Sequence, residues 1–343
     1  MDAARSITPP RSWTDPVSHH LKALESPWYR ALVFLQDSML RSTVAFWRER
    51  GAVCAQLPIT TGSVSSPMGL GSDSSPVAVD MFGVRTYLAD SMQFGLEYLC
   101  RLSGTDTYYF MPAFRGENPD DTHLCQFYHS EVEIRGGLDD VAEVAEAYVR
   151  RLVTDLLADH EDLLSRLTGS RFGHVHRLLD RREPFGRMTF AEAVTDLGGD
   201  ERYVREVPDG GWRTLTRAGE QELLGRHGEF LWVTHWDRLA VPFYQATDEN
   251  TGCALNGDLL FGPGEVIGAG ERHATGEQVD LALRHHRVTR ADYEWYLAMK
   301  DVAPLRTAGF GMGSERFLMW LTDQDDIRDF QIFVRENGRD IVP

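Results

Sequence analysis

Gly309-Phe310-Gly311-Met312-Gly313-Ser314-Glu315-Arg316 is the stretch of this sequence that most strongly decides its fold. Alternating glycines followed by an apolar segment predict a strand that turns directly into a helix, over 308–321. The glycines would let this strand pack closely against a helix, which is one sufficient explanation for them. The stretch has neither the Gly-Lys-Ser/Thr of a phosphate-binding loop nor the spacing of the dinucleotide fingerprint. Its other interpretation is that the turn presents the Arg316 guanidinium to a nucleotide.

The composition favours an enzyme that handles anions with arginine. At 343 residues the chain can bury a large core, as one large domain or two ordinary ones. Its 52 acidic against 35 basic residues give a formal charge of −17, which disfavours a general nucleic-acid or anionic-membrane surface. Only Lys22 and Lys300 are lysines, so anions must be recognised by guanidinium groups, which bind carboxylate and phosphate bidentately.

Neither the cysteines nor the N-terminus indicates a metal-binding, secreted or membrane protein. The four cysteines are scattered, without a C-x-x-C pair. Residues 1–13 are polar and contain prolines, and no apolar run in the chain is long enough to span a membrane. We therefore expect a cytoplasmic protein without a membrane partner.

The order of the elements predicts an α+β fold with a largely antiparallel sheet. Ser26-Pro27 is a helix start, and apolar residues recur at helical spacing until Gly51. A second amphipathic helix is expected over 138–157, and strands over 52–59, 107–114, 126–134, 230–234 and 255–261. Strands in clusters with helices between the clusters are typical of this class. We expect residues 1–25 to be flexible, and residues 26–343 to form one catalytic domain with a helical insertion at about 160–228.

The predicted hairpin over 107–134 gathers an arginine, an aromatic ring and two carboxylates. Arg115 follows its first strand, and Phe127 lies on its second strand. Glu131 and Glu133 are two residues apart, so they share a face of that strand. Such a face suits a nucleotide, with the cation on phosphate and the ring on the base, although a solvated hairpin held by ion pairs has the same pattern.

A third set of polar residues suits a metal ion. Asp258 and Glu265 are seven residues apart, which can bring two carboxylates together across adjacent strands. Two carboxylates with nucleotide phosphates make a magnesium site. Arg272, beside small glycines, would grip a substrate carboxylate bidentately. Acidic residues near glycines are also typical of exposed turns.

Together the three sets resemble, in order and content, the class II aminoacyl-tRNA synthetases, and most closely their aspartyl/asparaginyl subgroup. Phe114-Arg115-Gly116-Glu117-Asn118, with His123, Phe127 and Glu131, resembles the second motif of the family, and 309–316 resembles the third. Residues 50–58 resemble the first motif, which usually builds a dimer interface. The resemblance covers about residues 28–340 and implies the family fold, an antiparallel sheet flanked by helices, in a homodimer.

The resemblance also implies ATP and Mg²⁺ as cofactors and assigns residues to them. Arg115 would bind the α-phosphate, Phe127 would stack under adenine, and Arg316 would cover the other face of adenine and reach the γ-phosphate. The implied ATP site consists of Arg115, Glu117, His123, Phe127, Glu265, Gly313 and Arg316. Asp258 and Glu265 would hold the magnesium ion.

The amino-acid substrate is assigned to a second set of residues, which are Asp73, Ser91, Gln93, Glu131 and Arg272. Arg115, Arg316 and Glu265 would carry catalysis. The implied reaction is in-line attack of a carboxylate on the α-phosphorus of ATP, which gives an acyl-adenylate and pyrophosphate.

Departures from the family pattern concern the acceptor of the acyl group. Full-length members of the subgroup carry an N-terminal anticodon-binding barrel, but the first motif's helix begins near Ser26, so no anticodon-binding domain is expected. Leu96 stands where aspartyl-tRNA synthetases have a lysine, and Ser314 where an aliphatic residue is usual. The loop over 119–122 lacks an arginine that is often present there. Ammonia-dependent asparagine synthetase, and the short asparagine synthetase related to asparaginyl-tRNA synthetase, are catalytic domains on their own.

The first hypothesis is therefore an ATP-dependent amide ligase. It would adenylate an aspartate- or asparagine-like amino acid and pass the acyl group to ammonia or a small amine, without tRNA. The second hypothesis is a synthetase paralogue that charges tRNA or a carrier protein. The third is a catalytically silent regulatory paralogue, against which the intact Arg115, Glu265 and Arg316 argue. The sequence identifies neither the acid, nor which of its carboxylates reacts, nor the acceptor.

Overall fold

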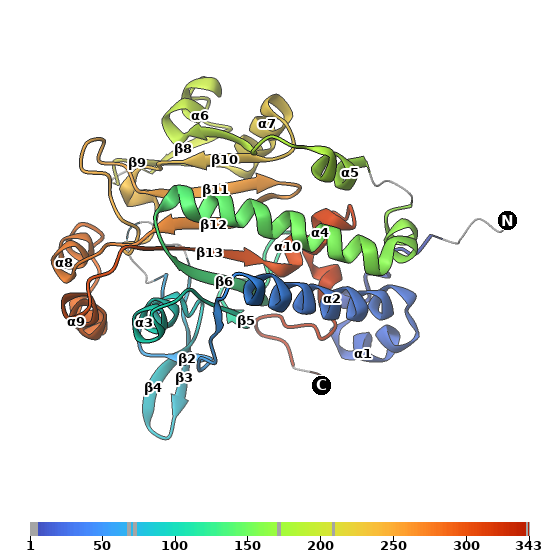
Figure 1. Cartoon of the computed structure of the whole chain (residues 1–343). Helices are drawn as coiled ribbons and strands as arrows, with labels where there is room; N and C mark the ends of the chain where they lie inside the picture. Colours follow the sequence, from blue (N-terminus) through green and yellow to red (C-terminus); the bar gives the residue numbers. More distant parts are fainter. Residues whose placement is uncertain are drawn as a thin grey trace.

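A mixed sheet forms the centre of the protein in a computed structural model that describes residues 6–66, 70, 74–169, 173–207, 210–340 and 342. Within these residues the sheet has eight strands, in the spatial order β1 (Val53–Cys54), β5 (Thr107–Phe114), β6 (Gln126–Arg135), β13 (Thr307–Gly313), β12 (Gly264–Glu271), β11 (Asn256–Phe261), β10 (Leu231–Thr234) and β7 (Gly186–Thr189) (Figure 1). The two outermost pairs, β1 with β5 and β7 with β10, are parallel, and the inner pairs are antiparallel. The predicted α+β fold with a largely antiparallel sheet is confirmed.

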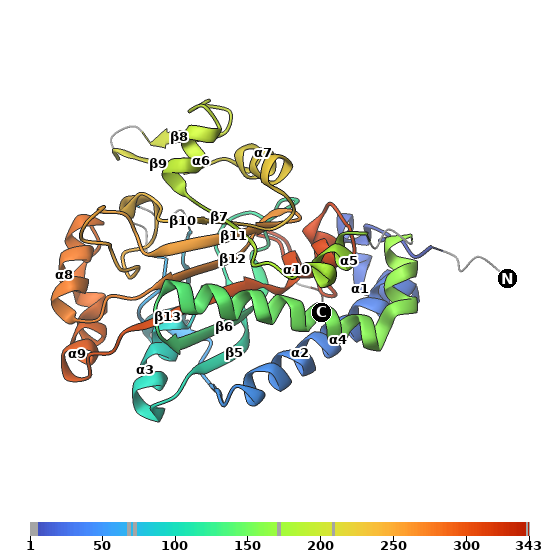
Figure 2. The same ribbon diagram turned by 45° about the horizontal axis from the view of Figure 1, so that its top comes forward.

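Two long helices, α2 (Pro27–Glu49) and α4 (Leu138–Thr168), run side by side across one face of the sheet (Figures 1 and 2). Helix α2 starts with Pro27 at its first turn, and Gly51 follows it with a left-handed φ of 77°. The Tyr148 hydroxyl joins the layers, because it hydrogen-bonds Thr43 Oγ1 of α2 at 2.7 Å and Ser130 Oγ of β6 at 2.8 Å. Helix α4 extends beyond the expected residue 157, through a kink at His160, because buried leucines continue its apolar face.

Strand β13 alternates between the two faces of the sheet. Ala308, Phe310 and Met312 are buried in the core against the long helices. Gly309 and Gly311 therefore lie on the opposite face, beside the carboxylates of β6. A Cβ on Gly311 would lie 3.0 Å from Glu131 Oε1, and one on Gly309 would collide with Glu133 and Arg272. The glycines thus leave room for charged side chains, which the packing interpretation of the sequence did not anticipate.

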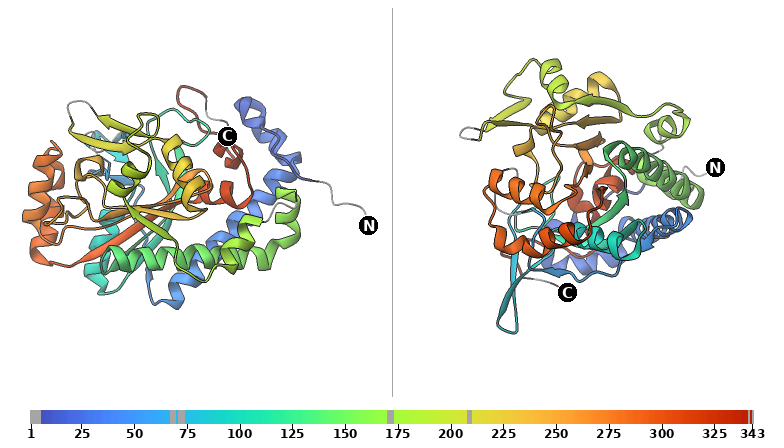
Figure 3. Two further views of the ribbon diagram at one scale, coloured as in Figure 1. Left: turned by 90° about the horizontal axis from the view of Figure 1, so that it is seen from above. Right: turned by 60° about the vertical axis from the view of Figure 1, so that its left-hand side comes forward.

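The remaining elements surround the sheet. Strands β2 (Thr60–Thr61), β4 (Val84–Leu88) and β3 (Val77–Met81) form a small sheet whose β3–β4 hairpin projects from the body (Figures 1 and 3). Helices α3 (Gln93–Ser103), α8 (Gly276–His285) and α9 (Glu294–Val302) share an aromatic cluster at one end of the sheet. Helix α10 (Ser314–Leu321) follows β13. The described residues also form short 3-10 helices, which are η1 (Ser12–Thr14), η2 (Arg238–Ala240), η3 (Arg290–Tyr293) and η4 (Ile327–Phe330).

Two segments differ from expectation. Residues 12–25, which were expected to be flexible, form η1 and α1 (Pro16–Glu25), and these pack on the body: Trp13 Nε1 donates to Asp329 Oδ1 at 2.7 Å, and His19 is buried. The segment expected as a helical insertion is mixed, with α5 (Gly173–Asp180), α6 (Phe190–Asp196), β8 (Val204–Val207), β9 (Trp212–Leu215) and α7 (Arg217–His227) along one edge of the sheet (Figure 2). Its β7 pairs with β10, so this segment extends the main sheet. Short strands with polar faces leave little periodic signal in a sequence.

The expected strand over 52–59 is reduced to the two residues of β1, because only Val53 and Cys54 pair with β5. None of the helices in the described ranges has the length and apolar character required to cross a lipid bilayer.

Candidate functional site

The turn from β13 into α10 fixes Arg316 at the edge of a cavity. The Glu315 carboxylate is buried and accepts the Tyr128 backbone N–H at 3.1 Å, which attaches the turn to β6. Ser314 Oγ donates to the Tyr128 carbonyl at 3.0 Å, so the serine at this position has a structural role. Arg316 Nη1 donates to the Glu265 carbonyl at 2.7 Å, and its Nε lies 3.4 Å from the Thr122 carbonyl. The guanidinium is therefore held between β12 and the loop of the hairpin.

The cavity at this turn has a volume of about 220 Å³, and six of the seven residues predicted for ATP line it: Arg115, His123, Phe127, Glu265, Gly313 and Arg316. The Arg115 guanidinium lies 5.5 Å from the centroid of the Phe127 ring. Arg115 Nε is buried and has no hydrogen-bond partner among the described residues. Since a buried donor without an acceptor is costly, an anionic ligand would satisfy it.

A second cavity of about 280 Å³ adjoins the first. The two share Arg115, His129, Glu265 and Gly311 in their linings. The second cavity also contains four of the five residues predicted for the amino acid, which are Ser91, Gln93, Glu131 and Arg272. The two predicted sets therefore meet at one boundary.

Glu131 is the buried anion of this second cavity. Its carboxylate accepts the Ser91 hydroxyl at 2.6 Å and the Tyr109 hydroxyl, and His129 Nδ1 lies 2.9 Å from its Oε1. Burial raises the pKa of Glu131, but the contacts with His129, Ser91 and Tyr109 outweigh it and hold the pKa below its usual value. The cavity thus contains a fixed negative charge that suits an ammonium or an amide N–H.

Arg272 is less available than the sequence predicted. Its Nε donates to both oxygens of Glu133 at 3.2 Å, and its Nη2 donates to Glu133 Oε2 at 3.1 Å. Its Nη1 donates to Gln245 Oε1 at 3.1 Å. Of the guanidinium N–H groups, one on each terminal nitrogen remains for a substrate. Glu133, which the sequence placed on the nucleotide face, is instead the partner of Arg272.

Asp258 and Glu265 approach each other as predicted, and Glu220 of α7 joins them. A Cβ on Gly268 would lie 3.0 Å from Glu265 Oε1 and 3.8 Å from Asp258 Oδ1, so this glycine leaves the space between the two carboxylates free. Glu220 Oε2 accepts the Glu265 backbone N–H at 3.2 Å. Burial, then the charges of Glu265 and Glu220, raise the pKa of Asp258 well above its usual value.

This surplus of negative charge fits a divalent cation. Over the described ranges no three histidine, cysteine, aspartate or glutamate side chains are arranged as a metal-binding group, so a cation here would take its other oxygens from phosphates. Sequence reasoning missed Glu220, because a single glutamate in a polar helix carries no functional signal.

Among the predicted residues that the structure describes, Glu117 does not line either cavity. Glu117 Oε1 accepts the Ser75 backbone N–H at 2.6 Å and fastens the preceding loop to the hairpin, but Glu117 lines neither cavity. Asp73 lies outside the described residues. The nearby Asp90 carboxylate holds the other end of that loop, accepting the backbone N–H groups of Ser65 at 2.9 Å and Ser66 at 2.6 Å.

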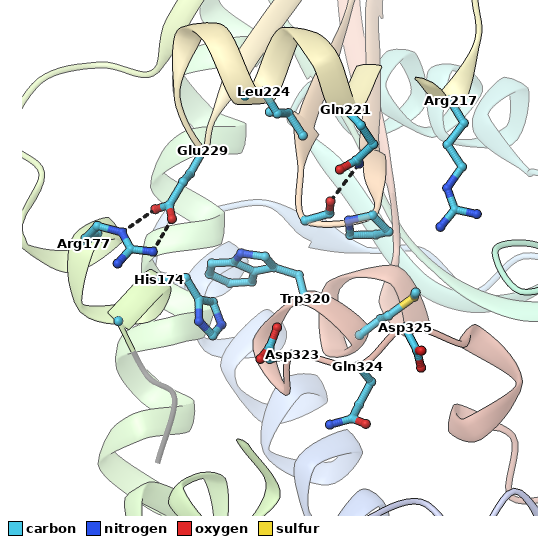
Figure 4. Close-up of a pocket in the computed structure, with 15 residues that line it drawn as sticks. His174, Arg177, Arg217, Gln221, Leu224, Glu229, Trp320, Asp323, Gln324 and Asp325 are labelled. Carbon is cyan, nitrogen blue, oxygen red and sulfur yellow. Dashed lines mark hydrogen bonds and ion pairs between the residues drawn. The ribbon is translucent and has the colours of Figure 1, made fainter. Parts of the chain in front are cut away.

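A third and larger cavity, of about 780 Å³, lies between α5, α7 and α10, and no predicted site residue lines it (Figure 4). Arg177 and Glu229 form an ion pair at its edge, and Gln221 Nε2 donates to the Gly262 carbonyl at 3.0 Å. The His174 ring packs edge-on against Trp320, at 5.2 Å between centroids. Its arginines Arg177 and Arg217 are already neutralised by carboxylates, in contrast to Arg115.

The largely antiparallel sheet, the strand-to-helix arginine and the second arginine over an aromatic ring define the catalytic domain of a class II aminoacyl-tRNA synthetase. The chain belongs to the family tRNA synthetases class II (D, K and N), whose profile matches residues 17–337. Members of this family are ATP-dependent ligases. The family resemblance stated from the motifs is thereby confirmed.

Known relatives agree with this assignment. The chain is 26% identical to an asparagine–tRNA ligase of Thermoplasma acidophilum, over 89% of this chain and 69% of that protein. It is 28% identical to an asparagine–tRNA ligase of Desulfitobacterium hafniense, over 89% of this chain and 71% of that protein. Asparaginyl-tRNA synthetase of Pyrococcus horikoshii, complexed with asparaginyl-adenylate, superposes with a TM-score of 0.84 at 22% identity, over 95% of this chain and 73% of that one. The asparaginyl-tRNA synthetase of Entamoeba histolytica, also in complex with asparaginyl-adenylate, superposes with a TM-score of 0.81 at 21% identity, over 100% of this chain and 74% of that one. These two structures share the fold.

Proposed function

We propose that this protein activates asparagine, or a closely similar amino acid, with ATP to an acyl-adenylate and transfers the acyl group to tRNA. The adjacency of the two cavities carries the proposal, because Arg115 and Glu265 border both and lie where a substrate carboxylate would meet the α-phosphate. The asparagine–tRNA ligases among the relatives support tRNA over ammonia or a small amine as the acceptor. The sequence alone favoured ammonia or a small amine as the acceptor and placed tRNA second, so the proposal reverses that order.

In the proposed activation step the substrate carboxylate attacks the α-phosphorus while arginines stabilise the charge that develops on phosphate oxygens. Arg115 stabilises the α-phosphate, and Arg316 stabilises the distal phosphates. Phe127 offers its ring to the base. A magnesium ion held by Asp258 and Glu265 would supply further neutralisation of the phosphates.

In the same proposal Glu131 and Arg272 orient the amino acid. The Glu131 carboxylate would attract an ammonium or amide group, and the remaining N–H groups of Arg272 would donate to a carboxylate or carbonyl oxygen. Ser91 and Gln93 complete the polar lining at the start of α3.

The second candidate is transfer to ammonia or a small amine, which the net charge of −17 favours because a polyanion would meet overall repulsion. ATP–pyrophosphate exchange over a panel of amino acids, followed by mass analysis with tRNA, ammonium, methylamine or a carrier protein as acceptor, separates the candidates. Acyl-tRNA formation would support the first proposal, and an amide formed without tRNA would replace it with the second. Absence of exchange with every acid would leave only a silent regulatory paralogue.

We also propose that the protein is a homodimer. Helix α2 exposes the apolar side chains of Val33, Phe34, Leu40 and Val44, although its opposite side is buried on α4. The helix leads directly into residues 50–58, which resemble the first motif, and an apolar stripe of this kind suits a second copy of the same helix.

A further inference from the structure

His129 lies where the two cavities of the site meet. It is on β6, opposite Gly313 of β13, and it lines both cavities. Its ring stands edge-on to Phe127, at 4.7 Å between centroids, and its side chain is 15% exposed. Among the residues that border both cavities, it is the one imidazole.

A buried carboxylate sits beside one nitrogen of this ring. His129 Nδ1 is 2.9 Å from Glu131 Oε1, although the N–H does not point straight at the oxygen, so a small ring rotation would complete the hydrogen bond. Glu131 cannot follow the ring, because the Ser91 and Tyr109 hydroxyls fix its other oxygen. Nε2 makes no hydrogen bond with any described residue.

A fixed carboxylate beside Nδ1 keeps the proton on that nitrogen and leaves a lone pair on Nε2. This is the arrangement of a general base that is oriented by a third group. Since Arg115 and His129 both border the two cavities, an acyl group bound between the amino-acid cavity and the α-phosphate would lie at the same boundary as the His129 side chain.

We infer that His129, oriented by Glu131, is the general base of the acyl-transfer step, a role that rests on the proposed function. The hydroxyl or amine of the acceptor attacks the acyl carbon, and its new bond to carbon forms as the bond from that carbon to the phosphate oxygen breaks. AMP leaves with the electron pair. The proton of the nucleophile passes to Nε2 and then to solvent.

Formation of the adenylate, the first step of the reaction, does not need a general base, because the attacking carboxylate carries no proton. His129→Gln should therefore change ATP–pyrophosphate exchange with asparagine by less than about tenfold. It should slow single-turnover transfer from the preformed adenylate about a hundredfold or more, the usual contribution of a general base. Added imidazole should restore part of the transfer rate of His129→Ala, which a merely structural role would not produce.

His174→Gln is the matched control. His174 also has a buried ring nitrogen without a hydrogen-bond partner in the part of the chain that the structure describes. It lines the third cavity (Figure 4), so its replacement should leave both rates near those of the wild type. Transfer is measured with a tRNA(Asn) transcript and, in parallel, with ammonium chloride.

Equal loss of both steps in His129→Gln, or unchanged transfer, would overturn the inference while the proposed function stands. Wild-type exchange without transfer to either acceptor would also overturn it. Absence of exchange in the wild type would instead refute the proposed function and the inference together.

Discussion

Replacing Arg316 with alanine tests whether the glycine-rich turn is the part of the site that binds ATP. The side chain is 25% exposed, and its guanidinium is held by the carbonyls of Glu265 and Thr122. Water from the cavity can replace these bonds, so the variant should lose only about 1 kcal/mol of stability. Removing one preorganised positive charge that faces the negative charge developing on a phosphate raises the activation free energy by about 2.7–4 kcal/mol, which corresponds to about a hundred- to a thousandfold in rate.

The assay is ATP–pyrophosphate exchange with asparagine, measured beside thermal unfolding. We expect kcat/KM to fall by that factor while Tm falls by no more than about 3 °C. Arg316→Lys keeps the charge but loses the planar fork, so it should recover only part of the rate. Arg177→Ala, in the third cavity, serves as the control. Exchange within about threefold of the wild type in a folded Arg316→Ala protein would refute the assignment of this turn to ATP.

Three further expectations concern stability and assembly. Lys300→Met should lower the free energy of unfolding by about 3–5 kcal/mol, because the buried Glu97 carboxylate would lose its closest cation, whose Nζ lies 2.5 Å away; a loss under about 1 kcal/mol in urea titrations would contradict this. Burial, and then the Lys300 charge, lower the pKa of His273 to about 4. Below pH 6.5 the unfolded chain therefore binds a proton that the folded protein does not, and the free energy of unfolding should fall by about 3 kcal/mol between pH 6.5 and 4. His273→Gln should remove this part of the pH dependence of the free energy of unfolding between pH 6.5 and 4. An unchanged pH dependence in the variant would contradict the role of His273. Phe34→Asp should convert dimers to monomers in sedimentation equilibrium, whereas a wild type that is already monomeric would refute the homodimer.

Much of the fold could be predicted from local patterns. The hairpin over 107–134 was placed almost to the residue, and so was the passage from β13 into α10, because turn residues and apolar periodicity are local properties. The insertion was misjudged as helical, because β7, β8 and β9 are short and owe their pairing to distant partners.

The candidate site shows the same division. Motif content brought Arg115, Phe127 and Arg316 to one cavity, and Ser91 with Glu131 to the next. The same motif assigned Glu117 to ATP, and in the structure one oxygen of its carboxylate accepts the Ser75 backbone N–H. Residue type states what a side chain can bind, but the direction of the side chain depends on the loop that packs against it.

The sequence by itself determined the class of fold, the strand-to-helix turn that carries Arg316 and the main charged residues of both cavities, because these follow from periodicity and from short motifs. Only the tertiary structure decided that Glu133 holds Arg272, that Glu220 approaches Asp258 and Glu265, and that the boundary of the two cavities falls at His129. The contacts of Glu133 with Arg272 and of Glu220 with Glu265 join strands and helices that lie far apart in the chain. Their geometry depends on sheet register and on the space left by glycines such as Gly268 and Gly309, which no local pattern encodes.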